Sequence, residues 1–411
     1  MKVLWIAHFV PFPPDGGARL RTYNLLRQAA KRFEVDLVAL NQRVNLPTAE
    51  AVAEAADRLR HIVRHVSVFP LPRDGSRPKR LVTAALSYGS SAPYGTHWLS
   101  SRPMRSYLRE RMATTRYDLV HLDTVDLWQY REPFVGRPIV LNHHNVESQV
   151  AARRADAERN PVVRHLLTRD ARKIALLEGR AVAAASSNLV VSALDADRLR
   201  AGIPEARIRI VENGVDPEFF RADLAATPVP KSLVFVGGMN WHPNRDAVVW
   251  LVEEIWPALV RDDPGRTLTL VGRFPPRAAH LAAGADDRLH IAGFVPDVRP
   301  HLDLAAIYLC PMRIGGGTRL KVLDALAMGR PLVATRIAVE GLDLEEERHY
   351  LPAETPVEFV RQVRRLEESP VLAARLAAAG RVLIEQKYAW DRIGERLASA
   401  YREAVAPVAS R

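Results

Sequence analysis

The chain has 411 residues and a formal net charge of +11, with 48% hydrophobic and 26% charged residues. This length predicts two domains, and the composition excludes a disordered or fibrous chain. The longest apolar runs are too short to cross a bilayer, and the N-terminus lacks a signal-peptide pattern. The single cysteine, Cys310, excludes an internal disulfide and a cysteine-based zinc site. We therefore expect a protein of the reducing cytoplasm.

Short apolar strands alternate with longer helical stretches along the first half of the chain. Helices are expected at residues 20–33, 49–63 and 150–184, among strands at residues 2–10, 35–40, 66–70, 117–123, 138–144, 187–194 and 208–216. This alternation indicates right-handed βαβ crossovers and a parallel sheet.

A second series of the same kind follows a proline-containing linker at residues 219–231. Its expected strands are residues 232–238, 267–272, 289–295, 305–311 and 331–335, with helices at residues 247–260 and 319–328. The sequence therefore predicts two doubly wound α/β domains in tandem. Ligands of such sheets bind beyond the carboxyl ends of the strands, so we expect a cleft between two facing sheets.

One glycine-rich segment, IGGGTRLKVLDALAMG, follows an expected strand, and its three glycines precede an expected helix. Glycines let backbone amides approach an anion closely, and a helix N-terminus adds partial positive charge. Arg319 and Lys321 would add full charges, and Asp324 would accept hydrogen bonds from sugar hydroxyls. This order suits a nucleoside diphosphate whose ribose lies along the helix; the alternative is a turn with solvated charges. The glycines are Gly315, Gly316 and Gly317.

Two further loops place paired glycines after the first strand of each domain. Gly16 and Gly17 belong to PDGGARLRTYN, and Gly237 and Gly238 belong to FVGGMNWHPN. Neither loop matches the dinucleotide pattern G-x-G-x-x-G, and the chain has no P-loop. Each loop alone is a weak signal, but both would open onto the expected cleft.

Together these segments resemble a GT-B glycosyltransferase of the large retaining group known as family 4, or glycosyl transferases group 1. The similar segments cover nearly the whole chain. They are PDGGARLRTYNLL, LNHHNVE, VVSALDADRL, VENGVDPEFF, LVFVGGMNWHPNRDAV, IAGFVPDV, GGGTRLKVLDALAMGRPLVAT and the terminal YAWDRIGERLASAYRE.

The resemblance implies two Rossmann-like domains facing across a cleft. Residues 1–222 would bind the acceptor, residues 223–389 the donor, and residues 390–411 would form a helix that crosses back to the first domain. The reaction would move a sugar from a nucleotide diphosphate sugar to an acceptor hydroxyl, with retention and without a required metal or cofactor. The basic first half of the chain, rather than the resemblance, leads us to expect polysaccharide or glycoconjugate biosynthesis as the process.

The resemblance also implies roles for individual residues. His144 falls on the family's cleft histidine, and Arg319 and Lys321 would stabilise the departing diphosphate. No metal ligands are expected, and the donor would carry UDP or GDP. The expected donor-binding residues are Gly16, Gly17, Gly237, Gly238, Phe294, Gly315, Gly316, Gly317, Thr318 and Asp324.

Two departures from the family pattern leave alternatives open. The first of two family glutamates is replaced by Gly316, and the second is shortened to Asp324; a diphosphate-binding lysine is replaced near Pro243 and Asn244. A non-catalytic nucleotide-sugar-binding protein is therefore one alternative. A same-fold nucleotide-sugar epimerase or phosphorylase is another.

Histidines and carboxylates elsewhere give weaker signals. His143 and His144 should point to opposite sides of a strand, one into the core and one toward the cleft. His8, at the end of the first strand, is a weaker candidate than His144. Glu147 and Glu178 fall in a long charged helical region, where a solvated face is the default.

Positive charge is concentrated in the first half of the chain. Residues 1–212 hold 33 Lys and Arg against 21 Asp and Glu, whereas residues 213–411 hold 25 against 26. Cations and aromatics interleave at residues 73–112, including Tyr88, Tyr94 and Trp98. An anionic membrane surface is one predicted partner and a solvated loop is the alternative; nucleic acid is not expected because no binding module is evident. The protein could thus be peripheral on the inner face of the membrane, besides binding a saccharide or lipid-linked acceptor.

Overall fold

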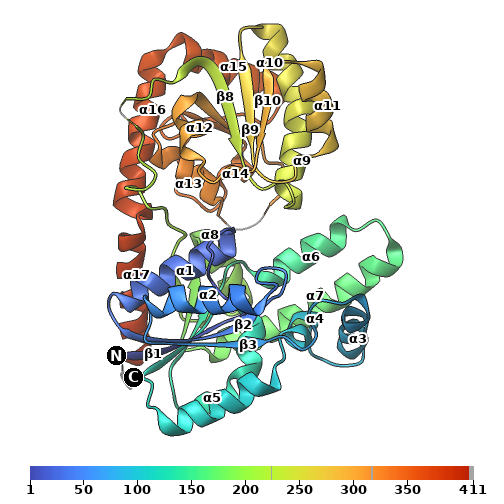
Figure 1. Ribbon diagram of the computed structural model, residues 1–411, viewed down its shortest axis with the longest axis vertical. Helices are drawn as coiled ribbons and strands as arrows, with labels where there is room; N and C mark the ends of the chain where they lie inside the picture. Colours follow the sequence, from blue (N-terminus) through green and yellow to red (C-terminus); the bar gives the residue numbers. More distant parts are fainter. Residues whose placement is uncertain (224, 316–317, 407–411) are drawn as a thin grey trace. The chain divides into compact units, whose positions relative to one another are not determined.

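The computed structural model describes residues 1–223, 225–315 and 318–406, which form two units (Figure 1). Unit 1 comprises Met1–Glu212 and the chain from Ile393 onwards, and unit 2 comprises Asn213–Arg392. The division precedes the expected boundary at residue 222. Among the described residues, none of the helices combines the length and apolar character that a bilayer crossing requires.

Unit 1 is built on a seven-stranded parallel sheet. In sheet order its strands are β3 (His65–Pro70), β2 (Glu34–Asn41), β1 (Lys2–Ala7), β4 (Leu119–Leu122), β5 (Ile139–Asn142), β6 (Ser187–Val190) and β7 (Ile208–Ile210). The central strands β1, β4 and β5 are buried on both faces, as expected for a sheet that helices cover on two sides.

The helices of unit 1 include one that comes from the far end of the chain. They are α1 (Gly17–Ala30), α2 (Ala49–Arg60), α3 (Arg77–Tyr88), α4 (Tyr94–Trp98), α5 (Arg102–Thr114), α6 (Glu147–Ala157), α7 (Pro161–Ala184), α8 (Ala193–Gly202) and α17 (Trp390–Val405), with 3₁₀ turns at Val125–Tyr130 and Glu132–Phe134. From Ile393, α17 belongs to unit 1, where Leu397 and Tyr401 are buried.

Unit 2 repeats the architecture on six parallel strands. In sheet order these are β10 (Leu289–Gly293), β9 (Thr267–Val271), β8 (Val229–Val236), β11 (Ala305–Cys310), β12 (Leu332–Ala334) and β13 (Leu351–Pro352). Its helices are α9 (His242–Trp250), α10 (Trp256–Asp262), α11 (Arg277–Ala285), α12 (Arg299–Leu304), α13 (Leu320–Ala327), α14 (Arg336–Val339), α15 (Pro356–Glu368) and α16 (Pro370–Leu383), with π turns at Leu251–Ile255 and Ile384–Tyr388.

The two parallel sheets confirm the predicted α/β class, and three local expectations are wrong. The single helix expected at residues 150–184 is two helices, because the Asn160 side chain caps α7 and Pro161 occupies its first turn. The interleaved residues 73–112 hold helices α3, α4 and α5 rather than a solvated loop. The expected linker ends earlier, since Val229 already begins β8.

Candidate functional site

The carboxyl ends of β1, β4 and β5 surround a buried carboxylate in unit 1. Asp123 directly follows β4 and is fully buried. Its Oδ2 atom accepts a hydrogen bond from the Thr22 hydroxyl at 2.7 Å, and its Oδ1 atom accepts one from the Asn142 amide at 2.9 Å. These two neutral donors fix the orientation of the carboxylate.

Three histidines lie around Asp123. Nε2 of His144 is 3.4 Å from Oδ1, while Nδ1 of His8 and Nε2 of His121 are each 3.8 Å from a carboxylate oxygen. Burial alone would raise the pKa of Asp123, but His144, His121 and His8 hold that pKa well below its ordinary value. Burial lowers the pKa of His8 to about 4, although Asp123 opposes this shift. At neutral pH the cluster therefore contains an ionised Asp123 and a neutral His8.

A buried arginine, Arg21, holds Asn142, one of the two donors to Asp123. The Arg21 guanidinium donates to Asn142 Oδ1 at 3.0 Å and to the carbonyl oxygens of Val211 and Glu212 at 2.8 Å and 2.9 Å. Burial lowers the pKa of Arg21 to about 10, so the side chain remains a cation at neutral pH. Because Arg21 occupies the amide oxygen of Asn142, the amide nitrogen points at Asp123.

The inner and outer members of the cluster differ in exposure. His121 is fully buried, stacks on Trp5 with 3.6 Å between ring centroids, and lies 2.7 Å from the Tyr401 hydroxyl of α17 through its Nδ1 atom. His144 and His8 keep 11% and 18% of their side chains exposed. His144 and His8 are therefore the members that a ligand could reach.

The two adjacent histidines follow the end of β5 and differ in burial, as predicted, although neither lies in the strand. His143 is buried, its Nε2 atom lies 3.2 Å from Asn188 Oδ1, and burial lowers its pKa to about 4. His144 is the partly exposed member of the pair. The strand end thus assigns one ring to the core and the other to the Asp123 cluster.

The expectation of a solvated face is wrong for Glu178. This residue is buried and accepts hydrogen bonds from the Glu147 backbone amide at 2.8 Å and from the Ser148 hydroxyl, so it caps the start of α6. Burial raises the pKa of the neighbouring Glu147 carboxyl to about 7, because its charged form is poorly solvated. Glu147 is therefore a second titratable group near His144.

His8, Asp123 and His144 also have the composition of a metal-binding group. Their ligand atoms all lie within 4.8 Å of one another, a spacing that a divalent cation bound by imidazole and carboxylate could use. Both Asp123 oxygens already accept hydrogen bonds from protein donors. Metal independence stays a prediction.

The first glycine pair lies where α1 begins. Gly16 is the N-cap residue and Gly17 the first helical residue, and both are exposed. A Cβ atom added to Gly16 would meet no atom within 4 Å, so packing does not require glycine there. The amides of this helix N-terminus are accessible to an anion.

In unit 2, Lys321 lies against the end of β8. Its Nζ atom donates to Asn244 Oδ1 and lies 4.6 Å from the centroid of the Phe235 ring. A Cβ atom added to Gly237 would come within 2.9 Å of this Nζ atom. Burial lowers the pKa of Lys321 to about 8, with the nearby Arg319 acting in the same direction. The predicted glycine and the predicted lysine are thus direct neighbours.

The paired residue Gly238 is held by the same amide. Asn244 Nδ2 donates to the Gly238 carbonyl oxygen at 2.8 Å, so Asn244 contacts Lys321 through one side-chain atom and the glycine backbone through the other. Sequence comparison with the family pattern marked Asn244 only as the absence of a lysine. The structure shows that it positions the lysine supplied by α13.

Thr318 and Arg319 directly precede α13. Arg319 is its N-cap residue and is buried, and a Cβ atom on Gly315 would come within 2.5 Å of its Nη2 atom. The Thr318 hydroxyl accepts a hydrogen bond from the Asn213 side chain. Gly316 and Gly317 lie outside the described residues.

Asp324 lies one turn beyond Lys321 on α13. Burial raises the pKa of its carboxyl to about 7. Among the described residues, no side chain donates a hydrogen bond to this carboxylate. Its oxygens therefore remain able to accept hydrogen bonds from a ligand.

Phe294 and Gly272 lie just after strands β10 and β9. Phe294, just after β10, is exposed, and the Arg273 guanidinium lies 4.0 Å from its ring centroid. Gly272 follows β9 with a φ of +147°, and a Cβ atom there would come within 2.0 Å of the Gly237 carbonyl oxygen. Sequence reasoning missed Gly272, although its position after a strand matches that of Gly237.

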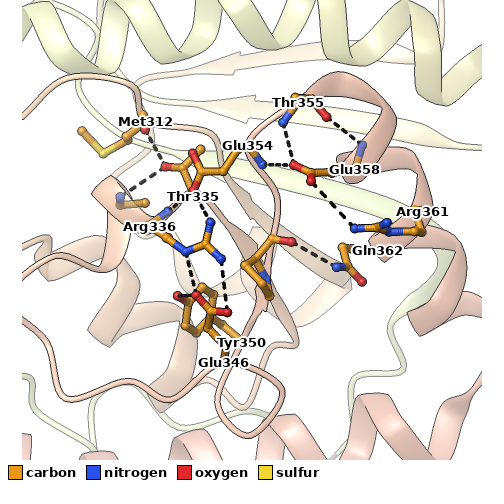
Figure 2. A network of polar contacts seen from close by, with 12 residues as sticks. Met312, Thr335, Arg336, Glu346, Tyr350, Glu354, Thr355, Glu358, Arg361 and Gln362 are labelled. Carbon is orange, nitrogen blue, oxygen red and sulfur yellow. Dashed lines mark hydrogen bonds and ion pairs between the residues drawn. The ribbon is translucent and has the colours of Figure 1, made fainter.

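A polar network fixes the strand end that precedes the glycine segment (Figure 2). The Thr335 hydroxyl donates to the Met312 carbonyl oxygen, and the Thr335 amide donates to the Cys310 carbonyl oxygen at 3.3 Å. These bonds tie the end of β11 to the end of β12, so the glycine segment starts from a fixed point. The network continues through Arg336, Glu346, Glu354, Thr355 and Glu358.

Two family models match the chain. The model described as Glycosyltransferase Family 4 matches residues 15–219, and the model described as Glycosyl transferases group 1 matches residues 230–369.

Two curated proteins are similar in sequence. The D-inositol 3-phosphate glycosyltransferase of Saccharomonospora viridis is 28% identical over 325 residues, which cover 71% of each chain. An uncharacterized 44.6 kDa protein in the cps region of Klebsiella pneumoniae is 23% identical over 139 residues, covering 32% of this chain and 36% of that protein.

Solved structures share the architecture. Sucrose-phosphate synthase from Thermosynechococcus elongatus has a TM-score of 0.68 at 18% identity, covering 98% of this chain and 99% of that one. Anabaena HepE in complex with UDP-glucose has a TM-score of 0.64 at 14% identity, with coverage of 98% and 99%. Identities this low establish the fold, which is that of the GT-B glycosyltransferases. The chain belongs to the group 1 glycosyltransferases, since the two family models together match most of its length, and the predicted membership is confirmed.

Proposed function

We propose that this glycosyltransferase moves a sugar from a UDP- or GDP-linked donor to a hydroxyl of a saccharide or lipid-linked acceptor, with retention. The placement of Lys321 carries the proposal. This largely buried cation is held by a neutral amide, Asn244, and it lies against Gly237, where a side chain would crowd it. Burying a cation is costly unless an anion compensates it, and a donor diphosphate would supply that anion.

The chemistry proposed for unit 2 is stabilisation of the leaving diphosphate. As the bond to the sugar breaks, negative charge develops on the phosphate oxygens, where preorganised donors lower the barrier. Lys321, Arg319 and the amides at the start of α13 would supply these donors, and Asp324 would accept hydrogen bonds from the ribose hydroxyls. No side-chain nucleophile is evident. Front-face transfer, in which the leaving phosphate takes the acceptor proton, is the mechanism we propose.

The role proposed for unit 1 is to hold the acceptor or the transferred sugar. His144 is the reachable member of the Asp123 cluster, and the ionised Asp123 favours a hydrogen bond from the facing His144 nitrogen. Asp123 is therefore a positioning residue for His144. HepE in complex with UDP-glucose supports a nucleotide-sugar donor, and the relative named D-inositol 3-phosphate glycosyltransferase supports sugar transfer.

The location and process are part of the same proposal. A cytoplasmic enzyme, in contact with the inner face of a membrane, would suit a lipid-linked acceptor and polysaccharide or glycoconjugate biosynthesis.

Donor binding and transfer can be measured separately. Thermal-shift measurements with UDP, GDP, dTDP and ADP should show stabilisation by UDP or GDP, and a labelled sugar donor should then yield a labelled acceptor. Lys321→Met should lose both effects, whereas Lys231→Met, a control on the surface of the same unit, should keep them. Donor binding without transfer to any saccharide or lipid-linked acceptor would contradict the transferase proposal and favour a nucleotide-sugar-binding protein.

A further inference from the structure

Helix α3 of unit 1 buries polar side chains and exposes apolar ones. Its buried residues are Thr83 and Ser87, whereas Leu81, Val82 and Leu86 are 71%, 55% and 42% exposed. A surface helix normally turns its apolar stripe toward the core. The reversed arrangement leaves an apolar stripe on the outside of the protein.

The reversed orientation is fixed by contacts with α7, beside which α3 lies (Figure 1). The Ser87 hydroxyl donates to Asp170 Oδ1 at 3.4 Å, and the Lys173 ammonium donates to the Ser87 carbonyl oxygen. The Arg169 guanidinium lies 4.5 Å from the centroid of the Tyr88 ring and donates to the Tyr88 carbonyl oxygen at 3.1 Å. The polar face is thus used for attachment, and α3 cannot turn its apolar face inward without losing these bonds.

Positive charge borders the exposed stripe. At the helical repeat of 3.6 residues per turn, Arg77 and Lys79 fall on the two sides of the stripe, and α3 contains no acidic residue. We name Arg77, Lys79, Arg80, Leu81, Val82, Leu86 and Tyr88 the α3 patch. The first turns of α7 expose further apolar side chains just before Arg169, namely Val162, Val163 and Leu166.

We propose that the α3 patch docks on the surface of an anionic lipid bilayer. Aliphatic side chains flanked by cations match such a surface, because the side chains enter the headgroup boundary while the cations meet phosphates. A second copy of the chain fits less well, since a symmetric contact would bring like charges together. Nucleic acid also fits less well, since leucine and valine cannot stack on bases and Arg169 already lies over the one aromatic ring of α3, Tyr88, at 4.5 Å from its centroid.

The structure narrows the surface suggested by the sequence. Tyr94 and Trp98, which the interleaved pattern included, are partly buried, and Trp98 packs against the core of unit 1. Arg105 is engaged by the Gln129 carbonyl oxygen at 3.0 Å and lies over the Tyr130 ring. Only the α3 end of that stretch presents free apolar surface beside cations. This inference does not depend on the proposed transfer reaction.

Flotation of the purified full chain with lipid vesicles tests the proposal. Binding is expected to vesicles of phosphatidylcholine mixed with an equal part of phosphatidylglycerol, to weaken as salt is added, and to be absent with phosphatidylcholine alone. Arg77→Glu/Lys79→Glu should weaken binding at least about 25-fold, because each cation near an anionic surface contributes about fivefold. Leu81→Ser/Val82→Ser should weaken it about tenfold.

Matched variants separate the α3 patch from general surface effects. Val357→Ser/Val371→Ser changes two side chains of unit 2 that are 76% and 80% exposed, and Arg58→Glu/Arg116→Glu changes two exposed cations of unit 1 outside α3. Both controls should bind vesicles like the wild type. Equal vesicle binding by the wild type and the α3 variants, or no binding by the wild type, overturns the proposal. So does dimerisation in sedimentation experiments that Leu81→Ser/Val82→Ser abolishes.

Discussion

Replacing Lys321 with methionine is expected to stabilise unit 2 while abolishing transfer. Burial lowers the Lys321 pKa from 10.5 to about 8, which corresponds to a cost of about 3 kcal/mol for keeping the charged form folded. Methionine fills a similar volume without the charge, but it loses the contacts with Asn244 and Phe235, worth about 1–2 kcal/mol together. The net gain at pH 7 should be about 1–2 kcal/mol.

The pH dependence gives this prediction its sharpest form. Between about pH 8 and 10.5 the unfolded chain binds more protons at Lys321 than the folded one, so this residue makes wild-type stability rise with pH across that window. Below about pH 8 the cost is fully present, and methionine never carries it. The stability difference between Lys321→Met and the wild type should therefore be largest near pH 7 and shrink toward pH 10.

Thermal unfolding measures the gain in stability, and a transfer assay measures the loss of activity. A gain of 1–2 kcal/mol should raise the midpoint of unit 2 unfolding by about 2–8 °C, and Lys231→Met, which alters an exposed ion pair with Asp263, should change it little. A less stable Lys321→Met variant whose difference from wild type is constant with pH would refute the desolvation argument. Wild-type transfer by that variant would remove Lys321 from the mechanism.

Three further perturbations test neighbouring residues. Gly237→Ala should reduce donor affinity at least about tenfold, because its Cβ atom would crowd the Lys321 ammonium. Gly16→Ala should fold normally, because the space around Gly16 is open. Isothermal titration with UDP or GDP compares the affinities of the two variants. His144→Ala should lower kcat at least about tenfold with little loss of stability. Replacing the buried His143 with alanine should instead lower the free energy of unfolding by about 2 kcal/mol or more. Comparable stability losses in the two variants would count against assigning His144 to the site and His143 to the core. Asp324→Asn should be more stable than wild type above pH 7, because the Asp324 pKa is raised to about 7 and its charged form is disfavoured in the folded state; stability curves that coincide from pH 5 to 8 would contradict this.

The fold could be predicted because its signals are local. Strands such as β1 and β11 are almost entirely apolar runs, and this pattern can be recognised without knowledge of tertiary contacts. The break between α6 and α7 was missed although Asn160 and Pro161 mark a helix start, because charged residues continue through the break. At that point the helix-capping asparagine and the proline decide where the helix starts, and the continuous run of charged residues does not.

The Asp123 cluster could not be predicted because it is assembled by strand adjacency. Asp123 is a single acid after a short strand, and nothing in its own segment distinguishes it from a turn residue. Its partners Thr22, Asn142 and Arg21 come from α1 and β5, which meet it only after β1 and β4 pair. Lys321 could be predicted from the glycine-rich motif, but its neutral partner on α9, Asn244, could be identified only from the packed structure of unit 2.

The origin of α17 sets an order on how the protein is made. The strands of unit 1 precede unit 2 in the chain, yet the Tyr401 hydroxyl that meets His121 belongs to the part of α17 that follows unit 2. Ile393, Leu397 and Tyr401 fill interior positions that water would otherwise contact. Unit 2, encoded entirely before Ile393, can complete its core before α17 is fully translated, whereas the core of unit 1 stays incomplete until Tyr401 has been added. A stop codon directly before Ile393 would therefore remove part of the core of unit 1, while every residue of unit 2 would still be translated.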